Sequence, residues 1–141
     1  MSIPTLLVLI GISASGKSTL AKSIEKEGYI ALSSDEIRGK IYGAGFPTDE
    51  KERDKLKSAI FNKIKNDAKY HLSLGQSVVI DATNLNRKKR IKLLTNLGSI
   101  PCYKKALLFI TSMETCKARN SRLAYEKRVP DEDMMRLLRG F

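Results

Sequence analysis

Short apolar runs alternate along the chain with longer stretches in which apolar residues recur at helical spacing. Four runs are short, rich in branched residues and bounded by polar residues or glycine, so each predicts a buried strand. They are residues 5–10, 29–32, 77–80 and 106–110. Strands that alternate with helices indicate an α/β fold, in which a parallel sheet of four to five strands is flanked by helices.

The segments between the first three runs carry the start and stop signals of helices. A helix is expected from Gly16 to a stop at Gly28, and Ser33 or Ser34 can cap a second helix over residues 35–41. After a glycine-rich break at 43–47, Thr48 is expected to cap a long helix that Gly75 ends. The apolar positions that recur every fourth residue along it are Leu56, Ile60, Ile64, Ala68 and Leu72.

Three further helices are expected in the second half of the chain. Asn84 or Asn86 can cap a basic helix that runs to Leu97. Thr111 and Glu114 have the spacing of a capping box for the next helix. A last helix is expected to begin at Pro130.

The composition is that of one globular domain with a large excess of positive charge. A length of 141 residues fits a single domain over residues 1–141, and the formal net charge is +11. Such a charge attracts polyanions such as nucleic acids, although generic solubility is the simpler interpretation. Cys102, Cys116 and His71 lack the spacing of metal ligands, so packing roles are expected for them.

No stretch of the sequence indicates a membrane segment or a signal peptide. No apolar run approaches the roughly 18 residues that a membrane helix needs. Residues 1–4 lack the basic start of a signal peptide, and the apolar run that follows is too short for one. A cytoplasmic location is therefore expected, which would be the host cytoplasm if the chain is encoded by a phage.

The strongest chemical signal is a phosphate-binding loop between the first strand and the first helix. Residues 11–18 match G-x-x-x-x-G-K-[ST] in full and stand between an apolar strand and a helix, as that motif requires. The glycines let the backbone turn so that successive N–H groups can bind phosphate. Lys17 is expected at the β- and γ-phosphates of ATP and Ser18 at Mg²⁺. Kinases, GTPases and motor ATPases share this loop, so the reaction must be inferred elsewhere.

Polar residues follow the second and third strands, at the sheet edge where ligands bind in open α/β folds. Asp35 and Arg38 are three residues apart and would share a helix face. A carboxylate that accepts a hydroxyl proton and a guanidinium that holds the acceptor are what phosphoryl transfer needs, although the pair could be a plain surface ion pair. Asp81 ends a Walker-B-like strand and could hold Mg²⁺. Thr83 and Asn84 could bind the acceptor, unless Asn84 is only a helix cap.

Two basic segments are candidates for contacts with phosphate. Arg119, Arg122, Lys127 and Arg128 could form a lid over the ATP phosphates that stabilises charge and excludes water. Residues 87–90 could touch a nucleic-acid backbone. The alternative for both segments is a basic surface exposed to solvent.

Taken together, these motifs resemble the kinase domain of the phage-type polynucleotide 5′-hydroxyl kinases. The matching segments cover most of the chain in order and in rough spacing: residues 11–19, 34–38, 80–84, 119–122 and 129–130. The resemblance implies an adenylate-kinase-like P-loop kinase fold with an arginine-rich lid at about 112–130. It also implies a transferase in nucleic acid repair, which moves the γ-phosphate of ATP to the 5′-hydroxyl of single-stranded DNA or RNA with ATP and Mg²⁺.

The resemblance assigns a role to each matching residue. Asp35 would be the general base, and Arg38 would contact a phosphate of the acceptor. Asp81, Thr83 and Asn84 would lie near the acceptor, and Ser18 and Asp81 near the metal. The residues implied in ATP binding are Gly11, Ser13, Ala14, Ser15, Gly16, Lys17, Ser18, Thr19, Arg119, Arg122 and Arg128. Lys17, Arg119 and Arg122 would join Asp35 and Arg38 in catalysis.

Other functions share part of this pattern. Many family members carry a second, phosphatase domain, but the chain has no D-x-D-x-[TV] motif, so no 3′-phosphatase activity is expected. A small-molecule or nucleotide-sugar kinase of the zeta-toxin or antibiotic-phosphotransferase type would also use a P-loop, an aspartate base and lid arginines. A third interpretation is a non-catalytic ATPase that binds nucleic acid. Asp35, as a candidate acceptor base, argues against it.

Overall fold

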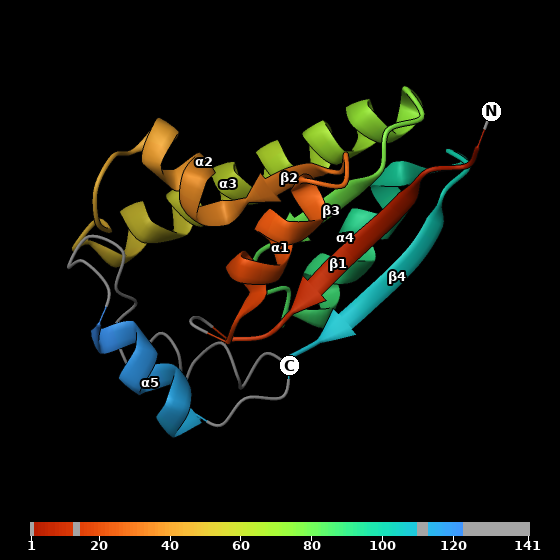
Figure 1. The fold of residues 1–141 in the computed structure, drawn as a ribbon. Helices are drawn as coiled ribbons and strands as arrows, with labels where there is room; N and C mark the ends of the chain where they lie inside the picture. The colour runs from red at the N-terminus through yellow and green to blue at the C-terminus, as the bar shows by residue number, and fades with distance from the viewer. Residues whose placement is uncertain (1, 13–14, 110–112, 123–141) are drawn as a thin grey trace.

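The computed structural model describes residues 2–12, 15–109 and 113–122 of the chain (Figure 1). Its strands are β1 (Thr5–Ile10), β2 (Ile30–Ser33), β3 (Val78–Asp81) and β4 (Tyr103–Leu108). They form a parallel sheet of four strands in the order β2-β3-β1-β4. The predicted α/β fold with a parallel sheet is therefore confirmed for the part of the chain that is described.

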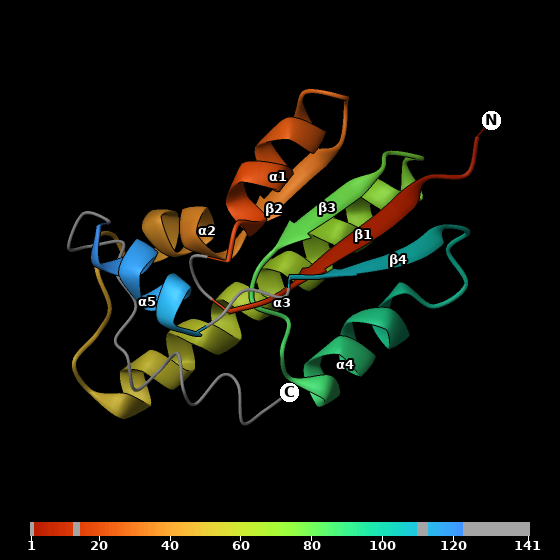
Figure 2. The same cartoon turned by 60° about the horizontal axis from the view of Figure 1, so that its bottom comes forward.

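Helices cover both faces of this sheet. They are α1 (Lys17–Glu25), α2 (Ser34–Ile41), α3 (Glu50–Ser73), α4 (Arg87–Leu97) and α5 (Met113–Ser121). Figure 2 shows α1 on one side of the sheet and α3 and α4 on the other. In both views α5 lies beyond the carboxyl ends of the strands, close to the start of α1.

Alternation along β1 and β3 divides the apolar side chains between two core clusters. Leu9 and Val79 pack with Ala21 of α1, and all three are buried. Val8 and Ile80, the next residues along each strand, belong to the larger cluster that α3 and α4 cover. Both central strands are thus buried on both faces, as their continuous apolar sequences predict.

The long helix α3 contributes the apolar stripe that its periodicity predicts. Leu56, Ile64, Ala68 and Leu72 are buried, and Ile60 packs partly buried against the same cluster. The remaining positions of the helix are mainly charged or polar and face solvent. None of the described helices has the length and the apolar character that crossing a membrane requires.

The structure shows which residues cap the N-termini of α2, α3 and α4, for which the sequence left alternatives open or predicted the wrong residue. Ser33 caps α2 and accepts a hydrogen bond from the backbone N–H of Glu36, and Asn86 caps α4. The prediction that Thr48 caps the long helix is wrong, because the Asp49 carboxylate accepts the N–H of Glu52. An ionised carboxylate also interacts favourably with the positive helix start.

Strand β4 starts earlier than predicted, and several predictions for the C-terminal part of the chain concern residues that the structure does not describe. Strand β4 begins at Tyr103, three residues before the predicted start, because it is an exposed edge strand and its lysines hide the apolar pattern. The predicted capping residue Thr111, the helix from Pro130 and the lid from residue 123 onward lie outside the described residues.

Candidate active site

The phosphate-binding loop connects β1 to α1 at the carboxyl edge of the sheet. Each of its two glycines is required for a different structural reason. Gly16 has φ 108° directly before α1, a conformation that other L-residues rarely adopt. Gly11 lies where a Cβ atom would stand 2.7 Å from Ser15 Oγ and 3.0 Å from Phe109 Cβ. Substitution of either glycine would therefore disturb the loop. Ser13 and Ala14 lie outside the described residues.

Lys17 is buried at the base of the loop, although it is the first residue of α1. Its ammonium donates to the carbonyl oxygens of Gly11 and Ile12, at 2.9 and 2.7 Å, and to Ser15 Oγ at 3.3 Å. Burial lowers the pKa of Lys17, whereas the negative charges of Asp81 and Asp35 raise it. Both carboxylates therefore favour the charged form of this ammonium.

Ser18 and Asp81 bring the loop and the end of β3 together. Ser18 Oγ donates to Asp81 Oδ2 at 2.8 Å. Burial raises the pKa of Asp81, while the Ser18 hydrogen bond and the charge of Lys17 lower it. A hydroxyl and a carboxylate in contact fit Mg²⁺ bound with ATP, because phosphates and water supply the other ligands. The described residues contain no group of three His, Cys, Asp or Glu side chains suited to holding a metal without a substrate.

Asp35 and Arg38 lie on the first two turns of α2, next to the end of β2. Arg38 Nη1 donates to Asp35 Oδ1 at 2.9 Å, which forms the ion pair that the i, i+3 spacing predicts. The two side chains differ in exposure, at 8% for Arg38 and 64% for Asp35. Asp35 thus presents an accessible carboxylate, whose charge contributes to the pKa values of both Lys17 and Asp81.

The guanidinium of Arg38 is held by an aromatic residue that the sequence did not point to. Phe46, in the loop between α2 and α3, places its ring 4.1 Å from Arg38 Cζ. Arg38 Nε is buried and has no hydrogen-bond partner among the described residues. A buried cationic donor without a partner carries a desolvation penalty, which a phosphate oxygen of a substrate could relieve.

Thr83 and Asn84 join the end of β3 to the phosphate loop. The Thr83 carbonyl oxygen accepts the N–H of Gly11 at 3.0 Å. Asn84 has φ 52°, and its Nδ2 donates to the carbonyl oxygen of Leu9 at 2.6 Å. Asn84 is therefore not the cap of α4, and its amide nitrogen stabilises the edge of the sheet. A contact of either residue with an acceptor stays a prediction.

The two described lid candidates lie at the end of α5. Arg119 is in the last turn of this helix. Arg122 follows the helix directly, and its N–H donates to the Arg119 carbonyl oxygen at 3.2 Å. Burial raises the pKa of Cys116 on the same helix, while the charges of Arg119 and Lys17 lower it. Helix α5 lies near the start of α1, and hence near the phosphate loop, in Figures 1 and 2. Arg128 lies outside the described residues.

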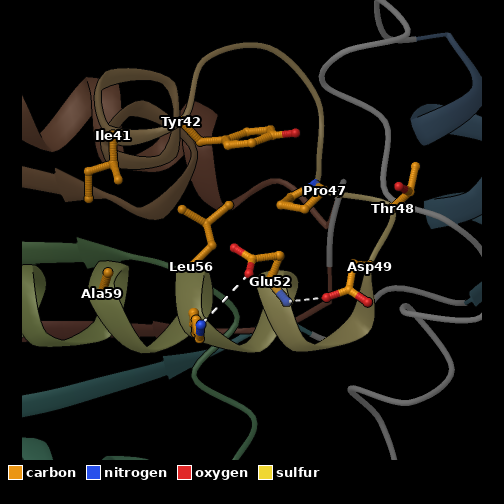
Figure 3. A pocket seen from close by; sticks show the side chains of 9 residues that line it. Ile41, Tyr42, Pro47, Thr48, Asp49, Glu52, Leu56 and Ala59 are labelled. Carbon is orange, nitrogen blue, oxygen red and sulfur yellow. Dashed lines mark hydrogen bonds and ion pairs between the residues drawn. The ribbon is translucent and has the colours of Figure 1, made fainter.

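A pocket of about 460 Å³ opens where α2 ends and α3 begins (Figure 3). Its walls include the side chains of Tyr42, Pro47 and Leu56, and its rim carries Asp49 and Glu52. Sequence reasoning assigned this segment only to a flexible break. The aromatic residue Phe46 inside a glycine-rich loop was the available signal that the loop packs against something.

A comparison with known protein families identifies the family of this domain. The AAA_33 family, described as an AAA domain, matches residues 6–141. The chain belongs to this family. Its phosphate loop, parallel sheet and flanking helices are those of a P-loop kinase domain, so the resemblance drawn from the motifs is confirmed at this level.

This domain is similar to a viral protein and to a chain of an RNA repair complex. A protein of Autographa californica nuclear polyhedrosis virus named "Putative bifunctional polynucleotide kinase/RNA ligase" is 36% identical over 89 residues, which are 57% of this chain and 12% of that protein. A chain in the structure of the Pnkp1/Rnl/Hen1 RNA repair complex matches with TM-score 0.79 and 18% identity. That match covers 99% of this chain and 44% of the other.

A small-molecule kinase has the same fold. The APS kinase of Mycobacterium tuberculosis, solved in complex with AMPPNP and APS, matches with TM-score 0.65 and 19% identity over 86% of this chain and 71% of the other. The fold alone therefore does not distinguish a nucleic-acid acceptor from a small one, and the acceptor must be inferred from the site.

Proposed function

We propose that this chain transfers the γ-phosphate of ATP to the 5′-hydroxyl of DNA or RNA, with Asp35 as the general base. The observation that carries the proposal is the Asp35–Arg38 pair at the end of β2, where an exposed carboxylate is joined to a buried guanidinium at 2.9 Å. The name of the viral relative, a polynucleotide kinase/RNA ligase, and the net charge of +11 support a nucleic-acid acceptor.

The transfer step assigns one task to each side chain. Asp35 accepts the proton of the 5′-hydroxyl, and the 5′-oxygen forms a bond to the γ-phosphorus. The bond between the γ-phosphorus and the bridging oxygen breaks, and ADP leaves with that electron pair. Lys17 stabilises negative charge on the β- and γ-phosphates as the bond breaks. When Mg²⁺ is bound through Ser18 and Asp81, it neutralises part of the phosphate charge.

The acceptor side distinguishes this proposal from hydrolysis of ATP. A GTPase or ATPase orients water and needs no second cation for an acceptor, whereas Arg38 offers a buried Nε without a partner among the described residues. In the proposed complex Arg38 donates to a phosphate of the acceptor strand, one nucleotide from the reacting hydroxyl. Arg119, Arg122 and Arg128 are proposed to contact the ATP phosphates from the lid.

The test is transfer of label from γ-labelled ATP to a short single-stranded oligonucleotide with a free 5′-hydroxyl. The control is the same oligonucleotide with a 5′-phosphate, which has no acceptor at that end. Label on the first strand alone is the expected result. Absence of label on both, while APS or a sugar accepts phosphate from ATP, would replace the proposal with a small-molecule kinase.

A further inference from the structure

Helices α3 and α4 lie on the same face of the sheet (Figure 2). One basic side chain from each helix lies near the same aromatic ring. The Nζ atoms of Lys65 and Lys89 stand 5.7 and 5.8 Å from the centroid of the Phe61 ring. Lys65 belongs to α3 and Lys89 to the first turn of α4. We use the name basic seam for this ring, the two lysines beside it and the two lysines whose charges act on Lys89: Phe61, Lys65, Lys89, Lys57 and Lys92.

The charges of the basic seam are poorly balanced by acids. Desolvation beside α3 lowers the pKa of Lys89, and the neighbouring charges of Lys57 and Lys92 lower it further. Asp54 is the acid whose charge raises that pKa. Farther along α3, Lys63 and Asp67 form their own ion pair at 3.1 Å. Like charges held near one another reduce stability, so their clustering suggests an anionic ligand.

Helix α4 adds to this cost. It has no acidic residue in its first turn, where Arg87, Lys88 and Lys89 place positive charge at the positive end of the helix dipole. Arg90 is committed elsewhere, because its Nη1 donates to the carbonyl oxygens of Asn84 and Leu85, both at 2.8 Å. These bonds fix the start of α4 to the loop that leaves Asp81. The basic seam therefore begins at the same sheet edge as the candidate active site.

The Phe61 ring makes the basic seam more than a set of mobile lysines. Phe61 is partly buried against the larger core cluster, so its position is set by the fold. Ammonium groups near an aromatic ring are held by its quadrupole while they still face solvent. Two cations from different helices are thus held at the surface, which lowers the entropic cost of binding phosphate groups.

We propose that the basic seam binds the phosphate backbone of the acceptor strand beyond its 5′-terminal nucleotide. This inference rests on the proposed 5′-kinase function and names the feature that makes a polynucleotide a better acceptor than a mononucleotide. Backbone contacts carry no sequence information, so single strands of different sequence bind equally well at the basic seam.

The experiment measures transfer to two acceptors that share the reacting end. One is a nucleoside 3′-monophosphate, and the other is a single strand of 12 nucleotides with a 5′-hydroxyl. The seam variant is Lys89→Gln with Lys92→Gln. The matched control is Lys22→Gln with Lys26→Gln, which removes the same charge from exposed lysines of α1 and its C-cap on the opposite face of the sheet.

The seam variant is expected to raise the KM for the long strand on the order of tenfold at about 0.1 M salt, because it loses up to two phosphate contacts. Each lost contact on a single strand also reduces, by about 0.7, the slope with which the logarithm of affinity falls against the logarithm of salt concentration. Its KM for ATP and for the mononucleotide is expected to stay unchanged, as is every value for the control. Equal kinetics of the seam variant and the wild type with the long strand would overturn the inference, and so would an equal loss in the control variant.

Failure of the proposed function gives a different signature. If the wild type phosphorylates neither acceptor, the 5′-kinase proposal falls, and binding of a fluorescent 12-nucleotide strand is then measured by anisotropy. Weaker binding by the seam variant than by the control would retain the basic seam as a nucleic-acid surface. Equal binding by both variants would overturn it.

Discussion

The ATP side and the acceptor side of the candidate site are built in opposite ways. On the ATP side, Lys17 and Asp81 are buried, and Lys17 is tied to carbonyl oxygens of the loop. On the acceptor side, Asp35 is largely exposed, although Arg38 behind it is buried. The fold thus fixes the side chains of the proposed ATP side, whereas the proposed acceptor side presents one exposed carboxylate.

This difference explains why a single motif predicts one side and not the other. ATP is always bound through the same phosphates, so backbone geometry and one lysine suffice. The acceptor varies between kinases of this fold, so its recognition depends on side chains of loops and helix ends. If the two sides are independent, a substitution on one side should change the use of its own ligand and leave the other ligand unaffected.

Lys17→Met should nearly abolish transfer. The substitution removes the cation that stabilises the transferring phosphate, and loss of one such group typically lowers kcat about 10²- to 10³-fold. Steady-state transfer at saturating ATP and acceptor measures the effect. The variant also loses the three hydrogen bonds that the ammonium donates, so some loss of stability is expected beside the loss of activity. A loss of transfer no larger than the loss of folded protein would show that Lys17 is mainly structural.

Asp35→Asn should lower kcat by about 10²- to 10⁴-fold, the usual contribution of a general base. The KM for ATP should change little, because the carboxylate lies on the acceptor side. Glu36→Gln is the matched control, since Glu36 is the neighbouring exposed carboxylate on the same turn of α2. Normal turnover by Asp35→Asn, or equal losses in both variants, would remove Asp35 as the base.

Phe46→Ala should raise the KM for the acceptor by roughly two- to thirtyfold, the range that corresponds to loss of a cation–π contact. The ring lies 4.1 Å from Arg38 Cζ and holds the guanidinium in place. Phe46→Tyr keeps the ring and should restore the acceptor KM, and the KM for ATP should be unaffected by either change. An effect on ATP instead of the acceptor would place this loop on the ATP side.

Asp81→Asn should separate activity from stability. Burial raises the pKa of Asp81 above 3.8, so the folded chain holds this proton more tightly than the unfolded chain does. Stability from this group is therefore present below pH 3.8 and lost as the pH rises through the raised value. The variant keeps an oxygen for Ser18 and removes the charge, so without ligand it should be at least as stable as the wild type near pH 7.

Denaturant unfolding from pH 3 to pH 7 measures this last effect. The stability difference between Asp81→Asn and the wild type should grow as the pH rises past the raised pKa. A difference that shrinks over the same range would mean that the ionised carboxylate stabilises the fold. Transfer activity of the variant should fall at every pH if Asp81 helps to hold Mg²⁺.

The sequence predicted the phosphate loop, the strand ends and the Asp35–Arg38 spacing because these are local in the chain. A strand, a glycine turn and a helix start follow one another over residues 5–19, so pattern alone locates them. The buried stripe of α3 is predictable for the same reason, since its apolar residues recur along one helix. The choice of Asp49 over Thr48 as cap was not predictable, because both residues cap helices well.

Contacts between distant segments could not be predicted from one sequence. Phe46 meets Arg38 across a loop, and Lys89 meets Phe61 across two helices, and neither contact has a local signature. Asn84 was assigned to a cap or a ligand because its bond to the Leu9 carbonyl oxygen spans 75 positions of the chain. The contacts of such residues depend on tertiary packing, which one sequence does not reveal.

The most direct test of the proposed acceptor is a competition in one reaction. γ-Labelled ATP is limiting, and a single-stranded oligonucleotide with a 5′-hydroxyl is present with an equal concentration of APS. Label confined to the 5′-end of the oligonucleotide, and lost with Asp35→Asn but not with Glu36→Gln, is the predicted result. Label on APS with an unlabelled oligonucleotide would contradict the assignment of a 5′-hydroxyl acceptor.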